Sequence, residues 1–177
     1  MKKVALLLVL TMISFTSCKK DAADVEFSTN LSKTSDQIDV NSPTLKSATS
    51  AYNETFIVNL ENPDTQDYIN KIKDIDLENV RITFQGLAGL AGNTTPTLLK
   101  LTINNQVVLE YNNFVYDRVA NGQDFVIDDT QKVDQMADLL KTAKKLTIKV
   151  EGNIPDAAMY QFYIKFMAKA NITASAL

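Results

Sequence analysis

The sequence contains no histidine, no tryptophan and a single cysteine, Cys18, among its 177 residues. Without histidine, the chain cannot build a Ser-His-Asp triad or a Cys-His pair, and it offers no imidazole ligand for zinc or iron. The lack of tryptophan removes the aromatic side chain that is best suited to stacking on a sugar ring. A single cysteine excludes an internal disulfide, so stability must come from packing. We therefore expect a protein that is not an enzyme, with no catalytic residue, metal or cofactor.

The overall charge is mildly acidic, at −3 from 18 Lys and Arg against 21 Asp and Glu. Residues 1–17 hold two of the lysines and no acidic residue, so without them 16 basic residues face 21 acidic ones and the net charge is −5. This charge makes the domain a poor partner for phosphates, and we expect no binding to nucleic acid. A hydrophobic content of 45% at this length predicts one folded domain.

The N-terminus carries the pattern of a secretory signal. Lys2 and Lys3 precede an uncharged run over 4–13, which is too short to span a bilayer, and Phe15-Thr16-Ser17-Cys18 closes it. This closing tetrapeptide resembles the lipobox of bacterial lipoproteins, with Phe15 where that family usually has leucine. The resemblance implies removal of residues 1–17, lipidation of Cys18 and anchoring to a membrane. The alternatives are an ordinary cleaved signal with an incidental cysteine, or a cytosolic protein with an apolar N-terminus.

Lys19, Lys20 and Asp21 follow the cysteine directly. This charged tripeptide resembles the surface-export signal of Bacteroidota lipoproteins. The resemblance implies a lipid-anchored protein of the bacterial outer membrane, with the cell surface as one option. On this interpretation residues 18–23 are the lipidated cysteine and a tether, and residues 24–177 are one domain.

Most of the chain after residue 50 alternates between apolar and polar residues, which is typical of half-buried strands. The longest alternation, over 160–170, has one apolar face that carries Phe162, Ile164 and Phe166. Such a run predicts a strand with one buried face and one face in water. We expect further strands at 55–60, 77–84, 97–103, 107–111, 125–127 and 146–150, and one or two edge strands before residue 52.

Two segments have the three-to-four-residue period of a short helix. Pro63 and Asp64 supply a helix start for residues 64–73. Asp128 and Asp129 do the same for residues 130–143, where Val133, Met136, Ala137 and Leu140 form one apolar stripe.

About nine short strands and two crossover helices predict a mainly β protein, an Ig-like β-sandwich. An α+β arrangement, with both helices on one face of a sheet, is the alternative. The pattern as a whole resembles small flavobacterial-type outer-membrane lipoproteins of Bacteroidota with an Ig-like domain. That resemblance adds no known activity.

Two sequence motifs invite a functional interpretation and do not support one. The glycines at 86, 89 and 92 lack the following Gly-Lys-Ser/Thr and the helix start of a phosphate loop, so we expect a connection that covers one end of the core. Asp74, Asp76 and Glu78 alternate along a strand without the glycine turn of a calcium loop, so we expect an exposed acidic edge.

These observations lead to two functional hypotheses. The first is a non-catalytic, lipid-anchored surface protein that acts by contact with an envelope protein. The alternative is a glycan-binding accessory module of an outer-membrane uptake system, with Tyr111, Tyr116, Arg118 and Tyr163 as its ligand face. For these aromatic residues, packing in the core or on a sheet surface is the competing interpretation.

Overall fold

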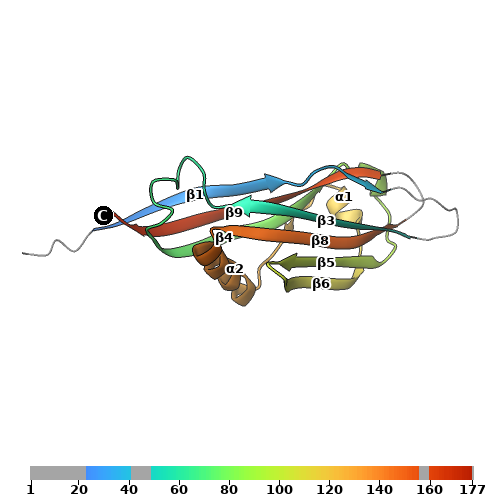
Figure 1. Cartoon of the computed structure of the whole chain (residues 1–177). Helices are drawn as coiled ribbons and strands as arrows, with labels where there is room; N and C mark the ends of the chain where they lie inside the picture. The colour runs from blue at the N-terminus through green and yellow to red at the C-terminus, as the bar shows by residue number, and fades with distance from the viewer. Residues whose placement is uncertain (1–22, 41–48, 156–159, 177) are drawn as a thin grey trace, which may run out of the picture.

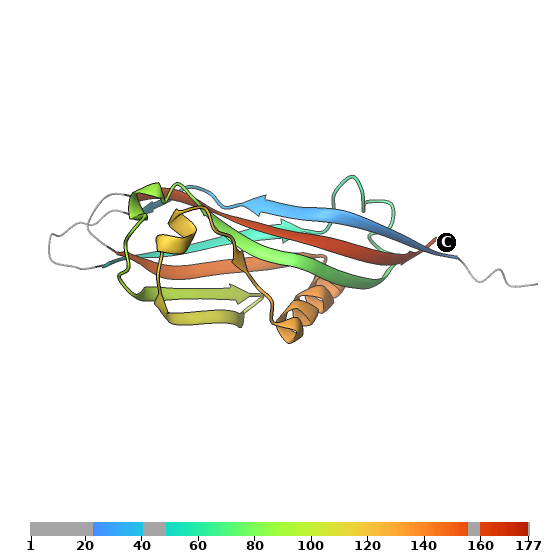
Figure 2. The ribbon, with the colours of Figure 1, turned by 180° about the vertical axis from the view of Figure 1, so that it is seen from behind.

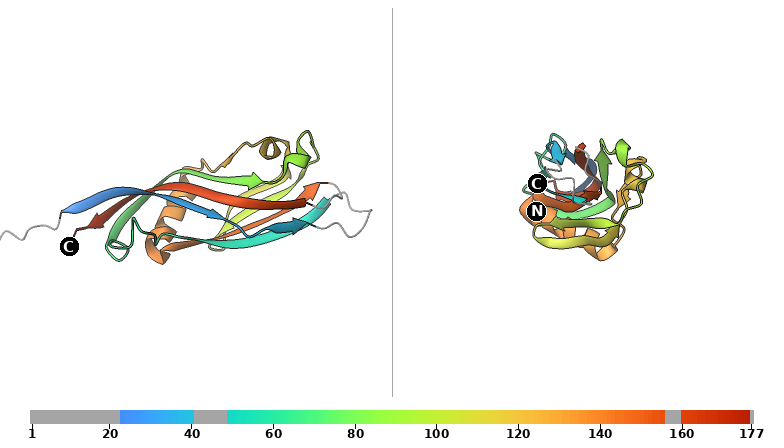
Figure 3. Two further views of the ribbon diagram at one scale, coloured as in Figure 1. Left: turned by 90° about the horizontal axis from the view of Figure 1, so that it is seen from above. Right: turned by 90° about the vertical axis from the view of Figure 1, so that its right-hand side faces the viewer.

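The computed structural model describes residues 23–40, 49–155 and 160–176 (Figure 1). The predicted signal, Cys18 and the tripeptide Lys19 to Asp21 lie outside the described residues. Within them, two antiparallel sheets pack face to face along the length of the molecule, and the end-on view shows the two layers (Figure 3). The expected mainly β sandwich is therefore confirmed.

The first sheet is built around the long C-terminal strand. In this sheet β9 (Tyr160–Ser175) pairs on one side with β1 (Asp24–Thr34) and β2 (Ile38–Val40), and on the other with β4 (Ile72–Gln85), which carries the short edge strand β7 (Phe125–Val126). The first and the last strand of the described residues therefore form one antiparallel pair, with Asp24 opposite Ser175. The predicted edge strands before residue 52 are thus confirmed as β1 and β2.

The second sheet has the order β3 (Thr49–Asn59), β8 (Lys145–Pro155), β5 (Thr97–Ile103) and β6 (Gln106–Phe114). The inward face of each sheet is apolar because alternate residues of its strands point to the core. Phe162, Ile164 and Phe166 of β9 are fully buried, and so are the facing side chains of β5 and β8: Leu99, Leu101, Ile103, Leu146, Ile148 and Val150. Burial of this size, at about 25 cal/mol per Å² of apolar surface, is the main stabilising term of the fold.

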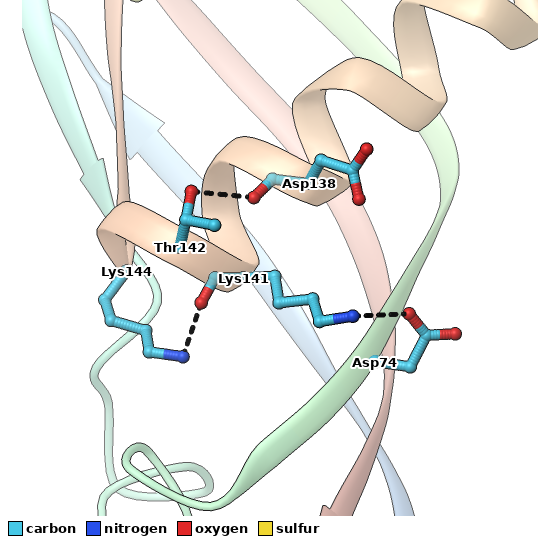
Figure 4. A network of polar contacts seen from close by, with 5 residues as sticks. All are labelled: Asp74, Asp138, Lys141, Thr142 and Lys144. Carbon is cyan, nitrogen blue, oxygen red and sulfur yellow. Dashed lines mark hydrogen bonds and ion pairs between the residues drawn. The ribbon is translucent and has the colours of Figure 1, made fainter.

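A hydrophobic stripe and its caps make α2 (Thr130–Ala143) a helix, with the predicted bounds. Met136, Ala137 and Leu140 are buried against β4 and β8, and the Asp129 side chain accepts a hydrogen bond from the Lys132 N–H at 3.2 Å. At the other end Lys144 has φ +59°, the left-handed conformation of a helix C-cap. Figure 4 shows this end, where Lys141 Nζ lies 3.4 Å from Asp74 Oδ1 of β4 and Lys144 Nζ donates to the Lys141 carbonyl at 2.6 Å.

The predicted helix over 64–73 is wrong, because residues 63–71 form a series of hydrogen-bonded turns and β4 begins at Ile72. Side chains take the place of a helical ladder here. Thr65 Oγ1 donates to the Leu60 carbonyl at 2.6 Å and accepts from the Asn62 N–H at 3.0 Å. Such local side-chain bonds compete with helix formation. The residues expected to form the apolar face of a helix pack instead against the first sheet, as in the 5.2 Å contact of Tyr68 with Phe27.

The glycine-containing loop over 85–96 covers one end of the core, as expected. The side chains of Leu87 and Leu90 are at most 2% exposed, and a short 3₁₀ turn, η1 (Ala88–Leu90), holds them there. Gly86 adopts φ +96°, and a Cβ at this position would lie 2.7 Å from the Gln161 carbonyl oxygen, so only glycine fits. Among the described residues, no helix has the length and apolar character needed to cross a membrane.

Candidate functional site

The sandwich is open along one side, between the β4–β7 edge of the first sheet and the β6 edge of the second. Viewed from behind, the connection from α1 (Asp117–Ala120) through β7 to α2 crosses this open side (Figure 2). It leaves a hollow of about 510 Å³, which we call the aromatic hollow. This volume is within the range of small-molecule sites. The side chains that decide its chemistry are Tyr111, Phe114, Arg118, Asp124, Phe125 and Asp128.

Three aromatic rings meet in this hollow, two from β6 and one from β7. The Tyr111 and Phe125 rings are 5.5 Å apart at 78°, and the Phe114 and Phe125 rings 5.9 Å apart at 65°. These are the edge-to-face geometries that aromatic pairs prefer. Phe114 is buried, whereas Tyr111 is 43% exposed, so the cluster joins the core to the surface. An apolar group of a ligand could thus contact ring surface here without disturbing the core.

The polar rim contains one cation that has no ionic partner among the described residues. Arg118 Nε donates to Gln123 Oε1 at 3.1 Å, and its guanidinium takes part in no ion pair within the described part of the chain. Asp124 is compensated by Arg81, whose Nη1 lies 2.9 Å from Asp124 Oδ2. Arg118 is therefore the cation of the rim that is free to meet a carboxylate.

The position of Arg118 depends on α1, which is fixed by its first residue. The Asp117 carboxylate accepts a hydrogen bond from the Gly92 N–H in the loop after η1, and a second from Asn121 Nδ2 at 3.1 Å. These contacts join α1 to the loop that covers the end of the core. The guanidinium is thus presented by a fixed turn rather than by a free loop.

The structure brings together only two of the four predicted ligand residues. Tyr111 and Arg118 both line the aromatic hollow. Tyr116 is fully buried, and its hydroxyl lies 2.8 Å from the Tyr52 hydroxyl. Tyr163 points outward from the first sheet, where its hydroxyl donates to Gln37 Oε1 at 2.8 Å. The predicted continuous glycan face is therefore wrong, because its tyrosines lie on separate surfaces or inside the core.

Phe125 belongs to the hollow and was expected only as a strand residue. Its alternation with Ile127 indicated a strand, but it could not show that β7 is a two-residue edge strand paired with β4, which brings the Phe125 ring to Tyr111 and Phe114 of β6. No cluster of three or more Cys, Asp or Glu in the described residues is arranged to hold a metal ion.

No protein-family model matches the chain, and no curated protein matches it. Among solved structures, a match is found with the decameric BFDV capsid protein, at 9% sequence identity and a TM-score of 0.41, covering 84% of this chain and 99% of the capsid chain. At these values the likeness carries no functional argument for this chain.

The comparisons do not agree with the family resemblance that the sequence suggested. The protein that they return is a viral capsid protein, where lipoproteins were expected. The resemblance to Bacteroidota outer-membrane lipoproteins has no support in these comparisons, so it is withdrawn together with the inferences from it: a lipid-anchored envelope function, the outer-membrane location, and the membrane, envelope-protein or glycan partner. Period-two alternation occurs in any antiparallel sandwich with one wet face, so it identifies a fold class and not a family.

The exclusion of nucleic acid is corrected as well. It depended on net charge, which says nothing of how charges are distributed. Arg81, Lys165 and Lys169 line one hollow that includes no acidic residue, and Lys165 forms no ion pair with the described residues, so the acidic total conceals a locally positive area.

Proposed function

We propose that this chain is a non-catalytic binding protein whose aromatic hollow takes a peptide-like ligand with an aromatic side chain and a free carboxylate. The observation that carries this proposal is the meeting of exposed ring surface at Tyr111 and Phe125 with an uncompensated guanidinium at Arg118. An aromatic pair contributes about 0.5–1.5 kcal/mol beyond its buried area, which favours a ring as the apolar group of the ligand. A guanidinium binds a carboxylate through two parallel hydrogen bonds.

Asp128 supports the peptide-like character of the ligand. It lines the same hollow, and it has no ion-pair partner among the described residues. A free carboxylate and a free guanidinium in one hollow suit a zwitterion, whose ammonium and carboxylate groups have opposite charges. Asp124 contributes little net charge because Arg81 compensates it.

The test is a titration followed by NMR chemical shifts and by calorimetry, with three dipeptide probes: Gly-Phe, its C-terminal amide, and Gly-Gly. Gly-Phe should bind, and the other two should bind at least about tenfold more weakly, because each lacks one recognised group. In Arg118→Gln, Gly-Phe and its amide should bind equally. In Phe125→Ala, Gly-Phe should bind no better than Gly-Gly.

Ile57→Ala is the matched control, because Ile57 is an apolar side chain of 43% exposure on β3, in the strand at the far edge of the second sheet. This variant should bind Gly-Phe as the unchanged protein does. Shift changes that avoid the signals of Tyr111 and Phe125, or equal binding of all three probes, would refute the proposal.

Three finer predictions from the sequence also stay proposals. They are an Ig-like form of the sandwich in residues 24–177, removal of residues 1–17, and lipidation of Cys18 followed by Lys19, Lys20 and Asp21 as a sorting signal. The intact mass of the mature protein tests the N-terminal ones, since cleavage and acylation change it by amounts that are easily distinguished. An unmodified thiol on Cys18 would contradict lipidation.

A further inference from the structure

The outer face of the first sheet, which points away from the second sheet, carries its charges in an ordered way. The register of β1, β9 and β4 places outward side chains in rows across three strands. At one end the rows contain Lys165 and Arg81, and at the other they contain Asp76, Asp74 and Glu26. The strands β1 and β9 are uncovered on this side, because α2 lies below β4 and β8, away from β1 (Figure 1).

The basic end is a shallow hollow of about 550 Å³. Its lining includes Arg81, Lys165 and Lys169 and no acidic residue. Lys169 is partly compensated by Glu78, at 3.2 Å, and Arg81 by Asp124. Lys165 forms no ion pair with the described residues, so this end keeps a positive charge.

The acidic end is a second hollow, of about 320 Å³, on the same face. Its lining includes Glu26, Asp74 and Asp76 and no basic residue. Lys141 partly compensates Asp74, at 3.4 Å, whereas Glu26 and Asp76 form no ion pair within the described ranges. The face therefore has one positive and one negative end, aligned along the strands.

From this arrangement we propose that two copies of this chain associate through the outer faces of their first sheets in antiparallel orientation, with the basic end of each copy on the acidic end of the other. A face with separated charges of both signs is complementary to itself only after a half-turn, which is the symmetry of a two-fold interface. Packed sheets lie about 10 Å apart with strand directions within about 30° of each other, and this arrangement allows the ends to overlap.

The size of the face sets the expected strength. Eleven paired residues of β1 and β9 across three strands cover about 36 Å by 14 Å, or about 500 Å² per copy. A total of about 1,000 Å² lies at the lower limit for specific association. The dimer should therefore be weak and should dissociate at high salt, because exposed charges are screened over about 10 Å at 0.1 M ionic strength.

The test is sedimentation velocity across a range of protein concentrations, at about 50 mM and about 500 mM salt. The unchanged protein should form a dimer at low salt, and its dissociation constant should rise at least about tenfold at high salt. Lys165→Glu alone and Asp76→Lys alone should each weaken the dimer at least about tenfold, because each places like charges together twice in a symmetric pair. An equimolar mixture of the two variants should form a heterodimer, in which both contacts are again of opposite sign.

Two controls keep the outcome clear. Lys145→Glu on β8 and Glu110→Lys on β6 make charge changes of the same sign and size at exposed positions of the second sheet, and they should leave the dimer unchanged. Circular dichroism of all variants shows whether each is folded. A protein that is monomeric at low salt, or single variants that do not recover on mixing, would overturn the proposal.

Discussion

Two tyrosine hydroxyls meet inside the sandwich, at Tyr52 of β3 and Tyr116 after β6, with 2.8 Å between the oxygen atoms. Each is the hydrogen-bond partner of the other, and the space beside them is limited, since a Cβ on Gly152 would lie 2.6 Å from the Tyr52 oxygen. A buried hydroxyl that loses its partner costs about 1–3 kcal/mol. This pair therefore contributes to stability only while both members are present.

We predict that Tyr52→Phe or Tyr116→Phe lowers the free energy of unfolding by about 1–2 kcal/mol. The double variant should lose less than the sum of the two single losses, because it leaves no hydroxyl unpaired. Urea unfolding followed by circular dichroism measures all three values. Tyr163→Phe is the control, because that hydroxyl is on the exposed face and water can replace its partner. Additive losses would show that the two hydroxyls do not depend on each other.

The same pair predicts a loss of stability in alkali. Burial raises the pKa of both Tyr52 and Tyr116 well above the usual 10.0, and the neighbouring Tyr116 raises that of Tyr52 further. Below about pH 10 both phenols are neutral in the folded and unfolded states. Above it only the unfolded chain ionises, so stability falls as pH rises, by about 1.4 kcal/mol per pH unit for each phenol. The urea midpoint should therefore fall more steeply between pH 10 and 11 in the unchanged protein than in the double Phe variant, and parallel curves would contradict this.

Tyr111 and Tyr116 show how far the sequence can predict the site. They are five residues apart, and both follow strand-like patterns. The sequence alone therefore placed both tyrosines on the same ligand face. The register with β5 shifts twice along β6, and these irregularities decide which side chains turn inward. Asn112 and Asn113 interrupt the strand pattern at one of these shifts, but the sequence does not show which side chains turn inward beyond the interruption. Arg118 and Tyr111 could therefore be named as site residues, but Tyr116 could not be excluded.

Helix α2 and the segment 64–73 show how far the sequence can predict whole elements. Four apolar residues at helical spacing and an acidic start predicted α2 with its bounds, because the stripe and the cap indicate the same structure. In 64–73 the apolar pattern extends over fewer residues. The Thr65 hydroxyl donates to a backbone carbonyl and the Asn62 side chain accepts from a backbone N–H, where a helix would have its own backbone hydrogen bonds. A short segment between two strands also has too few residues to offset the cost of helix nucleation.

At the helix start, we predict that Asp129→Ala lowers the free energy of unfolding by about 1 kcal/mol, because the Lys132 N–H loses the capping carboxylate and keeps only the Asp129 backbone carbonyl, at 3.0 Å, as an acceptor. Chemical denaturation measures the change. Asp134→Ala is the control, since Asp134 is an exposed residue of the same helix and does not cap it. The capping role would be refuted by equal losses in the two variants.

For the whole molecule, β9 is the strand on which the first sheet depends. Its alternation was visible in the sequence, but its partners were not, because β1 and β9 lie at opposite ends of the chain and pair over eleven positions. Pairing between such distant segments depends on loop closure and on the shape of the common core, which local patterns do not encode. The fold class was therefore predictable, whereas the strand order, and with it the open side that holds the aromatic hollow, was not.

This dependence can be tested at two adjacent residues of β9. Phe166 is fully buried between the sheets, whereas Lys165 points to the outer face, so the two have opposite roles in the same part of the strand. We predict that Phe166→Ala lowers the free energy of unfolding by about 3–5 kcal/mol and that Lys165→Ala changes it by less than about 0.5 kcal/mol. Far-UV circular dichroism and tyrosine fluorescence should give the same urea midpoint in each variant, because β9 joins β1, β2 and β4 in one cooperative sheet. Separate midpoints for the two signals would show that the two sheets unfold independently, and the sandwich would then not be a single cooperative unit.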